Sequence, residues 1–269
     1  MSMDVLTKEK EWNYPIWFAH RGGGNVAPEN TMPGFKACYR FGFRAVEFDV
    51  QLCCDKAAVV IHDHDLFRVA NDNRSVSSLK LADLVKINVA AQHPTYKVAF
   101  VPSFEEVANF CVSHNVAANI EIKPNIREEE ETAILVGKAA LHYWQRAQVR
   151  PLFSSFSLTS LKALQQHYPD TWRGYLIEEW PESDEQLLDT LKRLDCVSLH
   201  APYKVLTQRR INKIKQAGFA ILCWTVNDLN KAKQLLNWGV HGIITDMIDK
   251  VEFASDKKTS FDTMNTFVE

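Results

Sequence analysis

Segments that read as buried strands alternate with segments that read as helices along almost the whole chain of 269 residues. Such alternation is the pattern of βα units, which build parallel sheets. We expect eight strands of this type, and they begin near Ile16, Ala45, Ala118, Pro151, Gly174, Cys196, Ala220 and Gly242. This count and order predict a closed parallel barrel of the α/β class, in which reactive groups gather at the carboxyl ends of the strands.

The length of the chain agrees with that prediction, because such barrels have about 250 residues. Hydrophobic residues make up 46% of the chain and charged residues 24%, which is normal for a soluble globular protein. An open, doubly wound sheet is the alternative, but no Gly-rich dinucleotide-binding motif follows the first strand in the required context. We therefore expect one barrel domain over residues 1–269.

A less regular segment at residues 52–102 interrupts the predicted alternation. We expect an extra strand at Val59–Ile61 and a short helix at Leu79–Val85 within it. Ser103 and Glu106 have the spacing of a capping box and predict that a helix begins there. Because a βα connection of this length is usually functional, we interpret residues 52–102 as an insertion within the domain.

Charge and composition exclude several classes of partner. The chain has 31 Lys and Arg against 33 Asp and Glu, a formal net charge of −2, so we expect no nucleic-acid partner. No uncharged apolar run reaches transmembrane length, and the N-terminal segment has no apolar core of a secretory signal. We therefore expect a cytoplasmic protein without stable membrane insertion. The six cysteines show no CxxC spacing, which disfavours zinc or a disulfide framework.

The predicted strand from Ala45 to Gln51 has a polar face. Side chains alternate along a strand, so Glu47, Asp49 and Gln51 share one side. Two carboxylates in one space are costly to bury unless a cation neutralises them, and hard oxygen ligands suit Mg²⁺ or Ca²⁺. The alternative is a half-exposed strand with one solvated face.

In a barrel, several further polar side chains come to the same end as this face. They are His20 and Arg21 after the first strand, Glu121 and Lys123 at the third, Trp224 and Asn227 after the seventh, and Asp246 after the eighth. His62 ends the extra strand in the insertion. The convergence of three carboxylates, two histidines and two cationic side chains favours a functional site over packing.

These residues also carry a resemblance to a known family. The chain resembles the glycerophosphodiester phosphodiesterase family through an ordered set of motifs, namely His20-Arg21-Gly22, Pro28-Glu29-Asn30-Thr31, Glu47-Phe48-Asp49, His62-Asp63, Glu121-Ile122-Lys123 and Thr225-Val226-Asn227. The similarity runs from about Ile16 to Asp249. Segments 119–124, 154–156, 196–200 and 238–240 are similar to the bacterial cytosolic branch.

The resemblance implies a TIM (β/α)₈ barrel with a small insertion in its second βα loop. It implies that Glu47, Asp49 and Glu121 bind one divalent cation, with Mg²⁺ or Ca²⁺ expected and Mn²⁺ or Co²⁺ as alternatives. It also implies that His20 and His62 are the acid-base pair, with His20 as the base and His62 as the acid. The implied reaction hydrolyses small glycerophosphodiesters, such as glycerophosphocholine and glycerophosphoethanolamine, to sn-glycerol 3-phosphate and an alcohol.

Four side chains are candidates for substrate contacts. Arg21 and Lys123 would take the remaining charge of the phosphate. Phe156 and Trp224 lie at strand ends and would cover the glycerol or the leaving group, with packing at the rim as the alternative. Either water or the glycerol 2-hydroxyl would make the first attack. The chain departs from the family pattern at Asp55-Lys56 and at residues 71–75, which concerns the alcohol side of the pocket.

The sequence also leaves two other functions and one oligomeric state as alternatives. A phospholipase-like or sphingomyelinase-like enzyme would cleave an intact lipid, but the chain has no basic amphipathic segment for a membrane surface. A non-catalytic phosphate or metal sensor would not need both histidines and all three carboxylates. A homodimer is compatible with the sequence.

Overall fold

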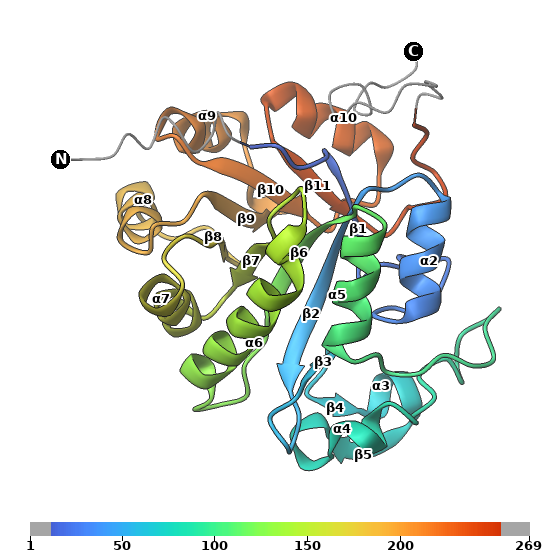
Figure 1. Cartoon of the computed structure of the whole chain (residues 1–269). Helices are drawn as coiled ribbons and strands as arrows, with labels where there is room; N and C mark the ends of the chain where they lie inside the picture. Colours follow the sequence, from blue (N-terminus) through green and yellow to red (C-terminus); the bar gives the residue numbers. More distant parts are fainter. Residues whose placement is uncertain (1–11, 254–269) are drawn as a thin grey trace.

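Eight parallel strands close into a barrel in the computed structural model, which describes residues 12–253 (Figure 1). The strands are β1 (Trp17–His20), β2 (Ala45–Leu52), β6 (Ala117–Ile122), β7 (Leu152–Ser155), β8 (Trp172–Leu176), β9 (Ser198–Pro202), β10 (Ala220–Trp224) and β11 (Gly242–Thr245). β1 pairs with both β2 and β11, which closes the sheet. The predicted TIM barrel is confirmed. The expectation of one domain over residues 1–269 extends at both ends beyond the described residues.

The barrel has an apolar half and a polar half. Alternate residues of β2 from Val46 to Val50 belong to the main core, together with the buried residues of the helices. A second apolar cluster includes Phe18, Leu152 and Leu222. Phe18 precedes His20 by two residues on the same face of β1, so the apolar layer comes before the polar one along the strand. The carboxyl-terminal half of the barrel is therefore left for polar side chains.

Seven helices of two or more turns follow or precede the barrel strands within residues 12–253, and they are α2 (Met32–Arg40), α5 (Phe104–Ser113), α6 (Glu129–Tyr143), α7 (Leu158–His167), α8 (Asp184–Arg193), α9 (Gln208–Gln216) and α10 (Leu229–Trp238). Short 3₁₀ turns lie at Trp144–Arg146 (η2) and Tyr203–Val205 (η3). Side-chain caps start most of these helices, and Ser103 and Glu106 form the predicted capping box. No helix in the described part is long and apolar enough to cross a membrane.

The segment between β2 and α5 folds beside the carboxyl end of β2 (Figure 1). It contains β3 (Ala58–Val60), β4 (Asp65–Leu66), α3 (Phe67–Ala70), β5 (Asp72–Ser75), η1 (Val76–Ser78) and α4 (Leu81–Leu84). β3 pairs with β2 in the antiparallel direction, and β4 with β5 in a separate sheet of two strands. A small apolar cluster that includes Leu66, Val76 and Leu84 stabilises this segment. We call residues 52–102 the insertion below.

The predicted extra strand and short helix are present in the insertion as β3 and α4, but β4, α3 and β5 were not predicted. Residues 65–75 are mostly polar and show no regular alternation. Their turns depend on local contacts: Asn71 ends α3 with a φ of 53°, and the backbone N–H of Arg74 donates to Asp72 over 2.9 Å. Such side-chain contacts leave no periodic signal in a sequence.

One barrel strand begins earlier than predicted. β8 starts at Trp172, although the sequence pattern indicated Gly174. The reason is Arg173, which has no exposed surface. Its guanidinium donates to the backbone carbonyls of Thr171 and Leu194, so its charge is solvated by the protein itself. An arginine is normally a sign of an exposed position, and here it belongs to a buried strand.

Candidate active site

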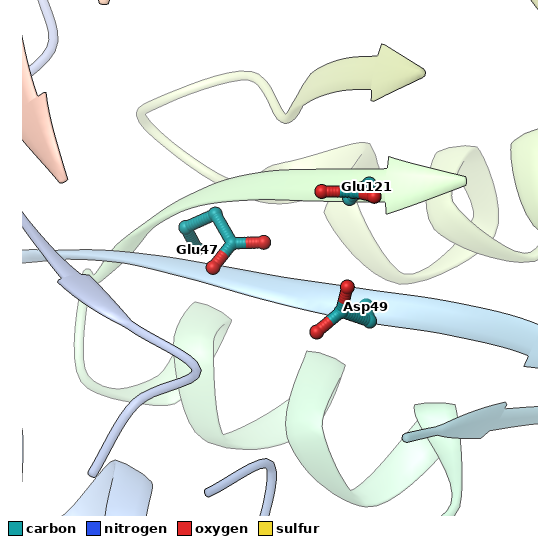
Figure 2. Close-up of side chains that lie close together, drawn as sticks. All are labelled: Glu47, Asp49 and Glu121. Atoms are coloured by element: carbon teal, nitrogen blue, oxygen red, sulfur yellow. The ribbon is translucent and has the colours of Figure 1, made fainter. Parts of the chain in front are cut away.

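Three carboxylates meet inside the barrel near the carboxyl ends of two neighbouring strands. Glu47 and Asp49 come from β2 and Glu121 from β6, and Asp49 and Glu121 are partners in the parallel register. Figure 2 shows the three side chains directed toward a common space. Each offers one oxygen, and these oxygens lie within 4.8 Å of one another. The structure thus brings together the three residues that were predicted as metal ligands.

The charges of this cluster are not fully compensated within the chain. Burial, together with Asp49 and Glu121, raises the pKa of Glu47 well above its usual value. Burial and Asp49 raise the pKa of Glu121 to about 8. Burial acts in the same direction on Asp49, but Arg21 and Lys123 outweigh it and lower the pKa of that carboxyl. Two of the three carboxylates therefore lack a sufficient positive neighbour.

This arrangement fits one divalent cation. The donors are hard carboxylate oxygens, which Mg²⁺ and Ca²⁺ prefer. Two uncompensated negative charges at Glu47 and Glu121 match the charge of such an ion. Without it, burial and mutual repulsion favour the protonated forms of Glu47 and Glu121, as the raised pKa values of both groups indicate.

Cationic and amide side chains surround Asp49. Arg21 Nε lies 3.6 Å from Asp49 Oδ2, and Lys123 Nζ lies 3.6 Å from Asp49 Oδ1. Lys123 Nζ is also 3.9 Å from Glu121 Oε1. Asn30 Nδ2 donates to Asp49 Oδ2 over 2.8 Å. The two cations predicted to contact phosphate thus lie next to the carboxylate cluster.

His20 ends β1 and lies between two carboxylates. Its Nδ1 is 2.6 Å from Asp246 Oδ1, and its Nε2 is 3.9 Å from Glu47 Oε2. Asn227 Nδ2 donates to the other oxygen of Asp246 over 2.7 Å and thereby orients that carboxylate. Because a carboxylate accepts, Nδ1 of His20 is the donor in this contact. Nε2 is then free to accept a proton on the side of the carboxylate cluster.

His62 follows β3 and has a similar partner from within the insertion. Its Nδ1 is 2.6 Å from Asp63 Oδ1, and Arg68 Nε donates to Asp63 Oδ2 over 2.6 Å. Arg68 also donates to both carboxylate oxygens of Glu29, which in turn accepts from Arg21. A chain of alternating charges therefore connects the two sides of the site.

The protonation of His62 depends on groups from both sides. Burial lowers the pKa of His62, and the charges of Arg21 and Lys123 lower it further. Asp49 and Asp63 oppose this effect but do not cancel it. His62 therefore releases a proton more readily than an exposed histidine does.

Gln51 is a residue whose role the sequence did not indicate. Its Nε2 donates to the backbone carbonyls of Ile61, His62 and Asp63 over 2.8–3.0 Å, and its Oε1 accepts from His64 Nδ1. Gln51 follows Glu47 and Asp49 on the inward face of β2. The same alternation that indicated the ligands could have pointed to it as a positioning residue.

Phe156 and Trp224 pack against each other at the rim. Their ring centroids are 5.9 Å apart with perpendicular planes. Trp224 ends β10, and its Nε1 is buried without a hydrogen-bond partner in the described part of the chain. Phe156 follows β7 and is 38% exposed. Their contact is compatible with both sequence-based alternatives, a wall of the substrate pocket and packing of the rim.

His200 lies in the middle of β9. It is fully buried, and its Nε2 is 2.9 Å from Ser198 Oγ. Burial lowers the pKa of His200 to about 3, which keeps it neutral. Gly174 on the adjacent strand leaves the space for its ring. We do not include His200 among the residues that contact substrate.

Residues 20–250 match the model of the glycerophosphoryl diester phosphodiesterase family. The chain belongs to this family. It is 29% identical over 234 residues to a glycerophosphodiester phosphodiesterase of Caldanaerobacter subterraneus subsp. tengcongensis, which covers 85% of this chain and 92% of that protein. A Bacillus subtilis glycerophosphodiester phosphodiesterase is 28% identical, with 86% and 83% covered. The predicted family and the predicted enzyme class, a phosphoric diester hydrolase, are confirmed.

Solved structures of the family have the same fold. A phosphodiesterase of Oleispira antarctica, determined in complex with the product sn-glycerol 3-phosphate, superposes with a TM-score of 0.80 at 28% identity. The superposition covers 88% of this chain and 95% of that one. A glycerophosphodiester phosphodiesterase of Thermotoga maritima gives a TM-score of 0.70 at 27% identity, with 88% and 96% covered.

Proposed function

We propose that this member of the family hydrolyses glycerophosphodiesters, such as glycerophosphocholine and glycerophosphoethanolamine, to sn-glycerol 3-phosphate and an alcohol. The main support is the meeting of Glu47, Asp49 and Glu121 in one buried space, with His20 and its carboxylate partner beside them. The complex of the Oleispira antarctica phosphodiesterase with sn-glycerol 3-phosphate supports the identity of the product.

Glu47, Asp49 and Glu121 would hold one divalent cation, Mg²⁺ or Ca²⁺, with Mn²⁺ or Co²⁺ as alternatives. When bound, such an ion supplies the positive charge that polarises a phosphoryl oxygen and orients the substrate. Arg21 and Lys123 would neutralise the remaining charge of the phosphodiester, since both lie beside Asp49. Phe156 and Trp224 would cover the glycerol or the leaving group from the rim.

His20 is assigned as the general base. Asp246 keeps the proton of His20 on Nδ1, so Nε2 can accept the proton of the attacking oxygen, either water or the glycerol 2-hydroxyl. The carboxylate of Asp246 then stabilises the imidazolium that forms. Asn227 fixes the orientation of that carboxylate. Proton transfers of this kind are each worth roughly 10²–10⁴-fold in rate.

His62 is assigned as the general acid. Asp63 holds its Nδ1, which leaves Nε2 to protonate the departing alcohol. The lowered pKa of His62 makes it a stronger acid, and the negative charge of a bound phosphodiester favours its protonated form. The alcohol leaves on the side of the insertion.

Hydrolysis by the purified protein tests this proposal. We expect release of sn-glycerol 3-phosphate from glycerophosphocholine, loss of activity with EDTA, and recovery with Mg²⁺ or Ca²⁺. A coupled assay for sn-glycerol 3-phosphate measures the product. Calorimetric binding of the diester without product, in the presence of each candidate cation, would instead support a sensor.

A further inference from the structure

A cavity lies between the barrel and the insertion, beside the proposed general acid. Its volume is about 630 Å³, and it is lined by Lys123, which follows β6, and by residues of the insertion that include His62, Asp65, Phe67 and Arg68. Pockets for small ligands usually measure roughly 300–1,000 Å³. Because His62 would protonate the departing oxygen, the alcohol must lie on the His62 side of the phosphate. The cavity is therefore in the right place for the alcohol.

The charged side chains that line this cavity have neighbours of opposite charge, with one exception. Asp63 accepts from His62 and Arg68, Arg68 is also paired with Glu29, and Lys123 lies close to Asp49. In residues 12–253, Asp65 forms no ion pair. Its Oδ1 accepts the backbone N–H of Phe67 over 2.9 Å, a contact that orients the carboxylate without neutralising it.

An exposed aromatic ring accompanies this carboxylate. Phe67 is the first residue of α3 and is 56% exposed, which is high for a phenylalanine. An aromatic face next to a carboxylate attracts cations, and quaternary ammonium groups bind well to such surfaces. Lys123 also lines the cavity, and because it lies beside Asp49 it would face the phosphate and repel a second positive charge. The cations Arg68 and Lys123 have carboxylate neighbours within the chain, which leaves Asp65 as the carboxylate available to a positive group of the substrate.

We propose that Asp65 and Phe67 make this enzyme prefer diesters whose alcohol carries a positive charge, such as a primary or quaternary amine, over diesters of neutral alcohols. The proposal rests on the proposed function, because it places the alcohol next to His62. The phosphate would lie beside Lys123, and the ammonium group beside Asp65. The preference would weaken at high ionic strength, since the cavity is open to solvent.

The test compares the metal-loaded full-length enzyme on glycerophosphocholine and on glycerophosphoglycerol, whose leaving alcohol is neutral. Asp65→Asn keeps the side-chain oxygen that accepts from Phe67 and removes only the charge. We expect it to lower kcat/KM for glycerophosphocholine about five-fold, the upper range for an exposed ion pair. The value for glycerophosphoglycerol should stay within about two-fold. Phe67→Leu keeps an apolar side chain and should lower the value for glycerophosphocholine about three-fold.

Asp83→Asn is the matched control, because Asp83 is exposed in α4 of the same insertion and does not line the cavity. It should leave both substrates unchanged. Equal kcat/KM for the two diesters in the wild type, with no change of their ratio in Asp65→Asn, would overturn the preference and leave the proposed function intact. Failure of the wild type to hydrolyse either diester with any of the four cations would overturn both.

Discussion

Two carboxyl groups of the barrel, Glu47 and Glu121, have pKa shifts opposite to those of Glu29 and Asp63 on the insertion side of the candidate site. In the barrel, burial and mutual repulsion raise the pKa values of Glu47 and Glu121. In the insertion and the loop next to it, burial opposes ionisation of Glu29 and Asp63, but hydrogen bonds from Arg68 outweigh it and lower both pKa values. Glu29 and Asp63 on the insertion side are thus neutralised by the chain itself. Glu47 and Glu121 on the barrel side lack such compensation, and this is the electrostatic basis of the proposed cation site.

The largest expected difference in activity is between a variant that removes one charge from the barrel side and a variant that removes one charge from the insertion side. Glu121→Gln should lower kcat/KM roughly 10⁴-fold, because metal ions contribute several kcal/mol to transition-state stabilisation. Arg68→Ala should lower it by no more than about ten-fold, since the Arg68 side chain is 48% exposed and its ion pairs are screened. Steady-state kinetics with glycerophosphocholine at fixed Mg²⁺, alongside calorimetric metal binding, measure both effects. Equal losses in the two variants would contradict the comparison.

The two histidines should be separable by the leaving group. We expect His20→Ala and His62→Ala each to lower kcat for glycerophosphocholine about 10³-fold. With the p-nitrophenyl ester of glycerol 3-phosphate, whose leaving group needs no proton, His62→Ala should retain activity within about ten-fold of the wild type. His20→Ala should stay impaired on both esters. If the p-nitrophenyl ester instead restored the activity of His20→Ala, His20 would be the acid and His62 the base.

Substitution of the carboxylate partners of the two histidines should lower kcat less than substitution of the histidines themselves, and by different factors. Asp246→Asn should lower kcat roughly 10²-fold, because an amide favours the wrong tautomer of His20. Asp63→Asn should lower it about ten-fold with glycerophosphocholine and leave the p-nitrophenyl ester unaffected, since Asp63 acts only through the acid. Circular dichroism should show an unchanged fold in both variants. An effect of Asp63→Asn on both esters would indicate a wider role for Asp63.

The smallest expected effect is the change of the free energy of unfolding with pH in the absence of metal. The raised pKa values of Glu47 and Glu121 mean that the folded state holds protons on these two groups. The unfolded chain releases the same protons above its usual carboxylate pKa of about 4.5. The free energy of unfolding should therefore fall by at least about 1 kcal/mol as pH rises toward 8. Urea unfolding in EDTA measures this slope.

Glu121→Gln should reduce this slope, and Mg²⁺ should restore the stability of the wild type at pH 8. Glu29 and Asp63 give the opposite sign, because their lowered pKa values stabilise the fold above the unfolded values and that contribution is lost in acid. An unchanged slope in Glu121→Gln would assign the pH dependence to other groups.

The barrel and its carboxylate cluster were predictable because both follow from regular periods. Alternation along β2 places Glu47 and Asp49 on one face, and the parallel register brings Glu121 beside Asp49. The contacts of Arg68 do not follow from a regular period of the sequence. Arg68 meets Glu29 across 39 positions of sequence, from a polar segment without periodicity. The cavity at Asp65 and Phe67 was not predicted for the same reason, since it depends on how β4 and α3 fold.

The contact between His20 and Asp246 has a consequence for the synthesis of this protein. His20 lies at the end of the first barrel strand, and Asp246 follows the last one, which pairs with it. A chain that emerges from the ribosome contains its three clustered carboxylates and both imidazoles long before translation reaches Asp246. With His20 as the proposed base, efficient turnover would wait until β11 joins β1 and brings Asp246 to His20, so the onset of activity during synthesis would mark closure of the barrel.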